Sequence, residues 1–154
     1  MLIWLEGTAL AQWVGLSFYA YPALLALHIT GLAVVVGIFF MRDLRLLGLI
    51  KQPSPADFLK PVRLAYAGFL LNAVSGFMLF TSQASIFAAS TSFRFKIAFI
   101  ALGMILAWQI QKRLALLLAK DHEQIPPNTR LLAAVSILCW VAAIIAGRLI
   151  AYLG

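Results

Sequence analysis

An uncharged apolar run near the start of the chain constrains the fold more than any other feature. It extends from Phe18 to Met41 and contains no Asp, Glu, Lys or Arg. About 20 apolar residues in a helix are enough to cross the hydrocarbon core of a bilayer. The run therefore predicts a transmembrane helix with His28 near its middle. An ionisable side chain at that depth is costly, so we expect His28 to face the interior of a bundle and a polar partner.

The rest of the chain repeats this apolar pattern. The sequence is 64% hydrophobic and only 11% charged, far below the roughly 25% charged residues of soluble domains. Four long apolar segments are separated by short, polar or proline-containing connections. They cover residues 19–41, 64–82, 95–118 and 131–152. The expected fold is an all-α integral membrane four-helix bundle, with residues 1–154 as a single transmembrane domain.

The segment before the first span is expected to form a short interfacial helix. It is short for a span, and it contains Trp4 and Trp13, a residue type enriched at membrane interfaces. Glu6 is its only charged residue. The alternative is an extension of the first span.

The basic residues lie in the gaps between the apolar runs. They form no patch with interleaved aromatic residues, so nucleic-acid binding is not expected. Of 12 Lys and Arg residues, nine flank the first and third connections and three lie on the opposite side. The nine are Arg42, Arg45, Lys51, Lys60, Arg63, Lys112, Arg113, Lys120 and Arg130. Because cytoplasmic loops are enriched in Lys and Arg, we expect a bacterial inner-membrane protein with both termini in the periplasm.

Several side chains are expected at the depth of His28, at about 1.5 Å of rise per residue. Asn72 and Ser75 lie at mid-depth of the second span and are the expected hydrogen-bonding neighbours of His28. Met104 lies about as far from the outer end of the third span, and Trp140 lies near the middle of the fourth. These residues would form a polar layer with one sulfur atom nearby.

The three cations on the outer side are Arg94, Lys96 and Arg148, and Glu6 is the only acid there. Unbalanced cations near a membrane boundary attract anionic groups, either lipid phosphates or the propionates of a cofactor. A neutral imidazole is a good axial ligand of haem iron. The pattern therefore favours haem b, with His28 as an axial ligand and Met104 or Met78 as a sulfur ligand.

Other interpretations of His28 stay open. It can be a structural histidine that hydrogen-bonds between helices, or a group that passes protons or a metal ion. His122, the second histidine, lies beside Asp121 and Glu123 and is expected to be a solvated loop residue. No acid is expected inside a span, and no catalytic triad or carboxylate pair is available. A non-enzymatic membrane subunit or small transporter, as a homo-oligomer or with a partner in a membrane complex, is therefore the alternative function.

Glycines in the spans favour close helix packing. Gly31 and Gly37 in the first span and Gly68 and Gly76 in the second put small residues on helix faces. Such residues let helix backbones approach each other in lipid.

The sequence LHITGLAVVVGIFFMRDLRLLG, which starts at Leu27, resembles the first-span signature of a bacterial family of small four-span membrane proteins with no assigned activity. SGFMLFTSQ, FRFKIAF and GRLIAY also fit this family, and the match covers nearly the whole chain. More distantly, the layout is similar to the copper-resistance protein D family and to the membrane protoporphyrinogen oxidase that binds haem b. In those families a histidine lies early in the first span, and in the oxidase a lysine opens the third. His28 and Lys96 match these positions, so the resemblance implies a haem site at His28.

Overall fold

The computed structural model describes residues 2–120 and 124–153, without the side chains of residues 151 and 153. Every regular element in this part of the chain is a helix, which confirms the all-α prediction. In chain order the elements are α1 (Leu2–Glu6), α2 (Ala9–Leu16), α3 (Ala20–Leu47), the 3₁₀ turn η1 (Pro55–Phe58), α4 (Val62–Thr81), α5 (Ala84–Ala89), α6 (Thr91–Ala119) and α7 (Pro127–Leu153).

Four helices are long and apolar enough to cross a membrane, namely α3, α4 together with η1, α6 and α7. Each buries only a narrow stripe of its surface. In α4 the buried residues recur every three or four positions, from Ala65 to Leu79. Large apolar side chains such as Leu70 and Phe77 are exposed on the other faces. Since water would not tolerate so much exposed apolar surface, the chain is a small multi-pass membrane protein.

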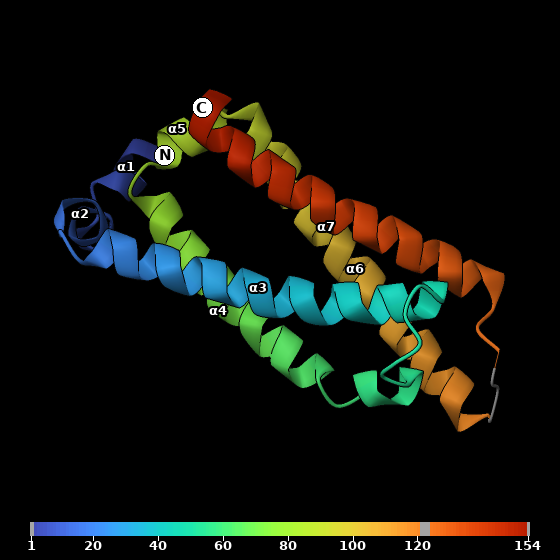
Figure 1. The fold of residues 1–154 in the computed structure, drawn as a ribbon. Helices are drawn as coiled ribbons and strands as arrows, with labels where there is room; N and C mark the ends of the chain where they lie inside the picture. Colours follow the sequence, from blue (N-terminus) through green and yellow to red (C-terminus); the bar gives the residue numbers. More distant parts are fainter. Residues whose placement is uncertain (1, 121–123, 154) are drawn as a thin grey trace.

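The four long helices pack as two antiparallel pairs, α3 with α4 and α6 with α7 (Figure 1). The pairs join mainly through contacts between α3 and α7. Toward the end of the bundle that holds α1, α2 and α5, the pairs draw apart in Figure 1. We call this end the N-terminal end. The termini of the described chain both lie there.

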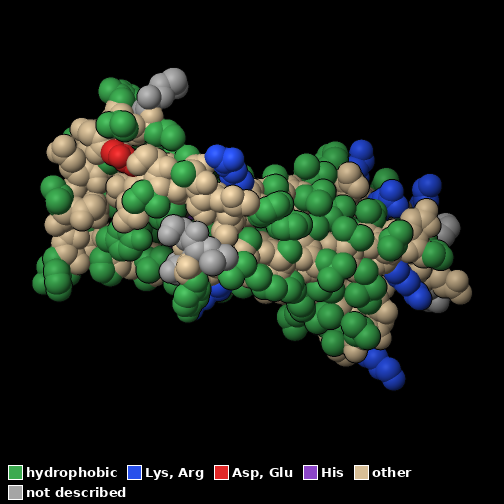
Figure 2. Space-filling model, turned by 90° about the horizontal axis from the view of Figure 1, so that it is seen from above, with side chains coloured by type: hydrophobic (Ala, Val, Ile, Leu, Met, Phe, Trp, Pro, Cys, Tyr) green, Lys and Arg blue, Asp and Glu red, His purple; other side chains and the backbone are tan. Residues whose placement is uncertain are grey.

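The opposite end carries the connections between α3 and α4 and between α6 and α7, and we call it the basic end. Most of the Lys and Arg side chains visible in Figure 2 lie at this end. The broad surface between the ends is covered mainly by hydrophobic side chains in this view. The distribution is the one expected of a bundle that exposes its sides to lipid.

Three apolar clusters fill the interior. The central cluster contains Val35, Phe39, Ala65, Ala107 and Trp140, and the basic-end cluster contains Leu46, Phe58, Ile110, Leu114 and Ala133. Both clusters draw on α3, α6 and α7. The N-terminal cluster, formed by Val14, Leu24 and Leu79, draws only on α2, α3 and α4. The two helix pairs are therefore packed tightly toward the basic end and less tightly near the N-terminal end.

The spans differ from their predicted bounds chiefly at the end of the first one. The prediction ended at residue 41, whereas α3 continues to Leu47 and is capped by Gly48, whose φ of +81° suits a residue without a side chain. The prediction that no acid lies inside a span is wrong, because Asp43 is buried in α3. At the N-terminus the structure has two short helices, α1 and α2, in place of the single interfacial helix expected.

Candidate functional site

His28 lies two turns inside α3 and hydrogen-bonds to α4. Its Nδ1 is 2.8 Å from the backbone oxygen of Asn72, and Asn72 Nδ2 donates to the backbone oxygen of His28 at 2.7 Å. Ser75 Oγ lies 3.4 Å from the same Nδ1 and donates to Leu71 O at 2.6 Å. The expected neighbours of His28 are confirmed. Together these contacts tie α3 to α4 in the N-terminal half of the bundle.

The hydrogen bond to Asn72 fixes which ring nitrogen carries the proton. A carbonyl oxygen only accepts hydrogen bonds, so Nδ1 of a neutral His28 is the protonated nitrogen. Among the described residues, every polar atom within hydrogen-bonding distance of the imidazole, namely Asn72 O, Asn72 Nδ2 and Ser75 Oγ, lies beside Nδ1 and none lies beside Nε2. Nε2 therefore keeps a lone pair that the described protein does not use. This arrangement is typical of histidines that ligate a metal, where a second interaction orients the ring.

Glycines on the facing surfaces make room for this contact. A Cβ on Gly76 would lie 2.7 Å from Cε1 of His28, and a Cβ on Gly31 would lie 2.7 Å from the backbone oxygen of Gly68. These distances are too short for any side chain, so glycine is needed where α3 crosses α4. The predicted packing role is confirmed for these three glycines. Gly37 differs, because a Cβ there would meet nothing within 4 Å.

The three predicted outer cations have different surroundings. Lys96 is half-buried on α6, and a Cβ on Gly147 of α7 would lie 3.5 Å from its Cδ. Its charge is close enough to act on the His28 imidazole. Arg94 is exposed and donates from Nε to the backbone oxygen of Ala88 at 3.0 Å, while Arg148 is exposed. Of these three cations, Lys96 is therefore the one that interacts electrostatically with His28.

Glu6 does not balance these cations. Its carboxylate accepts hydrogen bonds from the Ser85 hydroxyl at 2.6 Å and from the Ser85 backbone N–H at 2.7 Å. These two bonds hold the pKa of Glu6 below its usual value, so it is ionised at neutral pH. Its position ties α1 to α5.

The two methionines proposed as sulfur ligands pack into apolar clusters. Met104 packs against the central cluster, whose α3 members Val35 and Phe39 lie two and three turns beyond His28. Met78 packs against the N-terminal cluster. Cys139 is buried, as expected of a small apolar side chain. His122 lies outside the described residues. Within residues 2–120 and 124–153, no three His, Cys, Asp or Glu side chains come together as a metal site.

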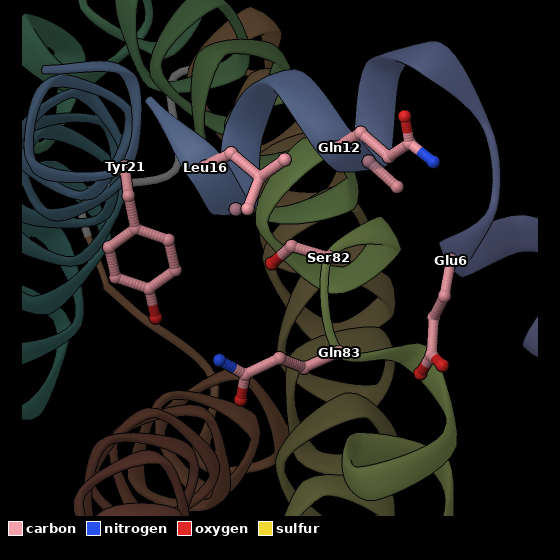
Figure 3. A pocket seen from close by; sticks show the side chains of 8 residues that line it. Glu6, Gln12, Leu16, Tyr21, Ser82 and Gln83 are labelled. Atoms are coloured by element: carbon pink, nitrogen blue, oxygen red, sulfur yellow. The ribbon is translucent and has the colours of Figure 1, made fainter. Parts of the chain in front are cut away.

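A pocket of about 640 Å³ opens at the N-terminal end, between α2, the start of α3 and the end of α4. Figure 3 shows the Tyr21 hydroxyl and the Gln83 amide extending into it, with Leu16 and Ser82 on the wall behind. Tyr21 precedes His28 by two helical turns, so both lie on the same face of α3. The pocket therefore lies between the histidine and the N-terminal end of the bundle.

Sequence reasoning missed a second polar site, where α3 meets α6 and α7. Arg42 and Asp43 are 1% and 0% exposed, and Arg42 donates to Asp43 Oδ1 through Nη2 at 2.7 Å and Nε at 2.9 Å. Arg42 Nη1 also donates to the backbone oxygen of Ala107 at 3.0 Å and lies 3.5 Å from Gln111 Oε1. Arg42, which the sequence analysis counts among the cations flanking the first connection, is thus buried within the bundle and paired with Asp43. The adjacent Arg-Asp pair at the end of an apolar run was the available signal.

We define the buried polar cluster as Arg42, Asp43, Gln111, Ser136 and Trp140. Phe39 links it to the central cluster: the Arg42 guanidinium lies 4.9 Å from the Phe39 ring centroid, and Phe39 stacks on Trp140 with centroids 6.1 Å apart. The cluster is thus at the joint between the two helix pairs.

Comparison with known proteins gives a family but no activity. Residues 17–153 match the family of unknown function DUF6644. The chain belongs to this family. No curated protein and no solved structure matches it. For this DUF6644 member, the predicted kinship with small four-span proteins of unassigned activity is in agreement with the match, whereas the distant similarity to copper-resistance protein D and protoporphyrinogen oxidase gains no support.

Proposed function

We propose that this membrane protein binds haem b through Nε2 of His28 and serves a redox-associated role in the bilayer. The single observation that carries the proposal is the 2.8 Å contact between His28 Nδ1 and the Asn72 carbonyl oxygen. It fixes the ring and leaves Nε2 with a lone pair at a depth where water is scarce. A neutral, oriented imidazole is the form of histidine that ligates haem iron.

The residues near His28 fit the chemistry of a haem. Gly76 accommodates the flat imidazole against α4. Lys96, which acts electrostatically on His28, supplies a positive charge for a propionate. Arg148 and Arg94 are exposed, so we assign them at most an outer contribution. When bound, the haem would supply one-electron chemistry between its ferric and ferrous states.

Met104 is assigned to packing in this proposal, since its contacts are with the central cluster. His28 is then the only protein ligand proposed for the iron. We place the protein in the bacterial inner membrane with both termini in the periplasm, so that the haem would lie in the outer half of the bilayer. This orientation is supported by the difference in charge between the two ends. Nine basic residues flank the connections at the basic end, and eight remain when the buried Arg42 is left out.

The test is the visible absorption spectrum of protein purified in detergent from haem-replete cells. We expect a Soret band that His28→Ala abolishes while the protein still inserts and remains monodisperse. His122→Ala is the matched control, because it removes the only other imidazole and should leave the band unchanged. A colourless wild-type preparation would overturn the proposal, and a band that survives His28→Ala would overturn the assignment of the ligand.

A second candidate function rests on the reciprocal hydrogen bonds between His28 and Asn72. In that case the protein is a non-enzymatic membrane subunit or small transporter, and His28 is structural or passes protons or a metal ion. Bonds between helices in lipid contribute to stability even without a ligand. The same experiment separates the two functions, because a structural role predicts that His28→Ala lowers the melting temperature of a protein that has no Soret band.

A further inference from the structure

Three buried polar atoms where α3 meets α7 have no hydrogen-bond partner among the described residues. They are Asp43 Oδ2, Ser136 Oγ and Trp140 Nε1, and their side chains are at most 1% exposed. Buried polar atoms in folded proteins are nearly always paired, with protein groups or with ordered water. In a membrane span bulk solvent cannot serve them, so a bound partner is required.

The three residues lie within about one helical turn along the contact between α3 and α7. Phe39 on α3 stacks on Trp140 on α7, so these two residues lie at the same height in the bundle. One turn closer to the basic end, Asp43 on α3 faces Ser136 on α7, whose hydroxyl lies near the carboxylate but outside hydrogen-bonding geometry. Ser136 and Trp140 are four residues apart, so both side chains lie on the same face of α7. The three polar groups therefore border the same stretch of the contact between α3 and α7.

The hydrogen-bonding groups of these three side chains favour a neutral ligand that can both donate and accept hydrogen bonds. Arg42 occupies Asp43 Oδ1 with two of its N–H groups, which leaves Oδ2 as a bare acceptor. Trp140 Nε1 only donates, and a serine hydroxyl does either. A metal cation is disfavoured because the guanidinium already lies 2.7 Å from the same carboxylate. A small molecule with two donors and two acceptors satisfies all three atoms.

We propose that the buried polar cluster binds one ordered water molecule, which donates to Asp43 Oδ2, accepts from Trp140 Nε1 and bonds to Ser136 Oγ. An internal water typically makes about three hydrogen bonds to otherwise unpaired groups. The central cluster closes the site on one side through Phe39 and Trp140, and the basic-end cluster closes it on the other through Leu46 and Ile110. The water is therefore trapped between two apolar layers and joins α3 to α7.

A double-mutant cycle tests the water through the melting temperature in detergent. Ser136→Ala and Trp140→Phe each remove one of its partners, and each should lower the melting temperature by about 2–4 °C, the shift expected for one lost hydrogen bond in a chain of this size. Because both bind the same molecule, the double variant should lose clearly less than the sum. Ser136→Ala combined with Trp108→Phe, a change at an exposed indole, is the control and should be additive.

Additive losses at Ser136 and Trp140, or a higher melting temperature for Trp140→Phe, would overturn the proposal, since removing a donor that binds nothing is harmless or favourable. If the variants do not fold, an experimental structure of the wild-type protein at a resolution that shows water molecules tests the proposal instead. We expect a density peak about 2.7–3.2 Å from Trp140 Nε1 and Asp43 Oδ2. A dry site, with Ser136 Oγ donating directly to Asp43 Oδ2, would contradict it.

Discussion

The two nitrogens of the His28 ring have different surroundings, and this asymmetry supports the ligand role that we propose for the residue. Nδ1 is held by Asn72 and approached by Ser75, whereas Nε2 has no bond to the described residues. A purely structural histidine in lipid would gain by using both nitrogens, since each unpaired polar atom there is costly. The free Nε2 is therefore the atom through which an added ligand would stabilise the site.

Lys96 gives a separate test at the scale of one side chain. If its ammonium holds a propionate, Lys96→Met should weaken haem retention about tenfold or more, because a charge-assisted hydrogen bond contributes roughly 1.5–3 kcal/mol. Folding should change less, because methionine keeps much of the apolar stem. Bound haem per protein and the melting temperature in detergent are to be measured together.

Arg148→Met is the control, because Arg148 is exposed and should have little effect on haem. Equal loss of haem and stability in Lys96→Met, or loss of neither, would favour a lysine that only extends toward the lipid headgroups.

Some of the site followed from residue type and depth, and some did not. Depth alone put Asn72 and Ser75 level with His28, because helix rise is regular. The rotation of each helix about its axis cannot be read from the sequence in the same way. The sequence therefore could not show that Lys96, rather than Arg94 or Arg148, interacts electrostatically with His28. The pairing of Arg42 with Asp43 was missed because each charge was weighed alone, whereas two adjacent opposite charges can be buried together when a third helix supplies acceptors such as Ala107 O.

At the scale of helices, the close packing of α3 against α4 depends on glycines, which have no side chain. Gly31 would place a Cβ 2.7 Å from Gly68 O and 2.8 Å from Asn72 N, and both of these are backbone atoms that cannot rotate away. The two helices would have to separate to admit even a methyl group. Their separation would also lengthen the bonds between His28 and Asn72.

We therefore predict that Gly31→Ala destabilises the protein by about 1–3 kcal/mol, the usual cost of overpacking an interface. Thermal unfolding in detergent measures the loss. Gly37→Ala is the matched control on the same helix, because its Cβ would enter open space and alanine favours a helix over glycine by up to about 1 kcal/mol. Similar behaviour of the two variants would show that helix packing does not depend on close approach at Gly31.

Helix existence was predictable because each span is a long apolar run, and helix ends were less so. The second span was expected at 64–82 and α4 covers Val62–Thr81, a small shift. The first span was cut short at its charged residues, although the helix continues for another turn and a half to Leu47. Burial of the adjacent Arg42–Asp43 pair also depends on acceptors such as Ala107 O on α6, a tertiary effect that hydropathy along the chain does not contain.

At the scale of the whole molecule, the charge difference between the two ends predicts one orientation in the membrane. In a Cys139→Ala background, a cysteine at Gln52 or Gln124 should be protected from an impermeant thiol reagent added outside the cell. A cysteine at Ala89, at the N-terminal end, should be labelled. All three positions are exposed. The opposite labelling pattern would reverse the bundle and turn Lys96 toward the cytoplasm.

The burial of Arg42 and Asp43 between the two helix pairs has a consequence for the insertion of the chain into the membrane. During synthesis α3 and α4 emerge first, and as a hairpin they bring Arg42 and Asp43 to the membrane before Ala107, Gln111 and Ser136 exist. Until α6 inserts, the pair lacks the acceptors that Ala107 and Gln111 supply, so we expect the first hairpin to keep it near the headgroups. Insertion of the second hairpin would then allow α3 to reach its final depth. We expect a nascent chain that stalls before α6 to leave this pair in contact with water at the bilayer surface.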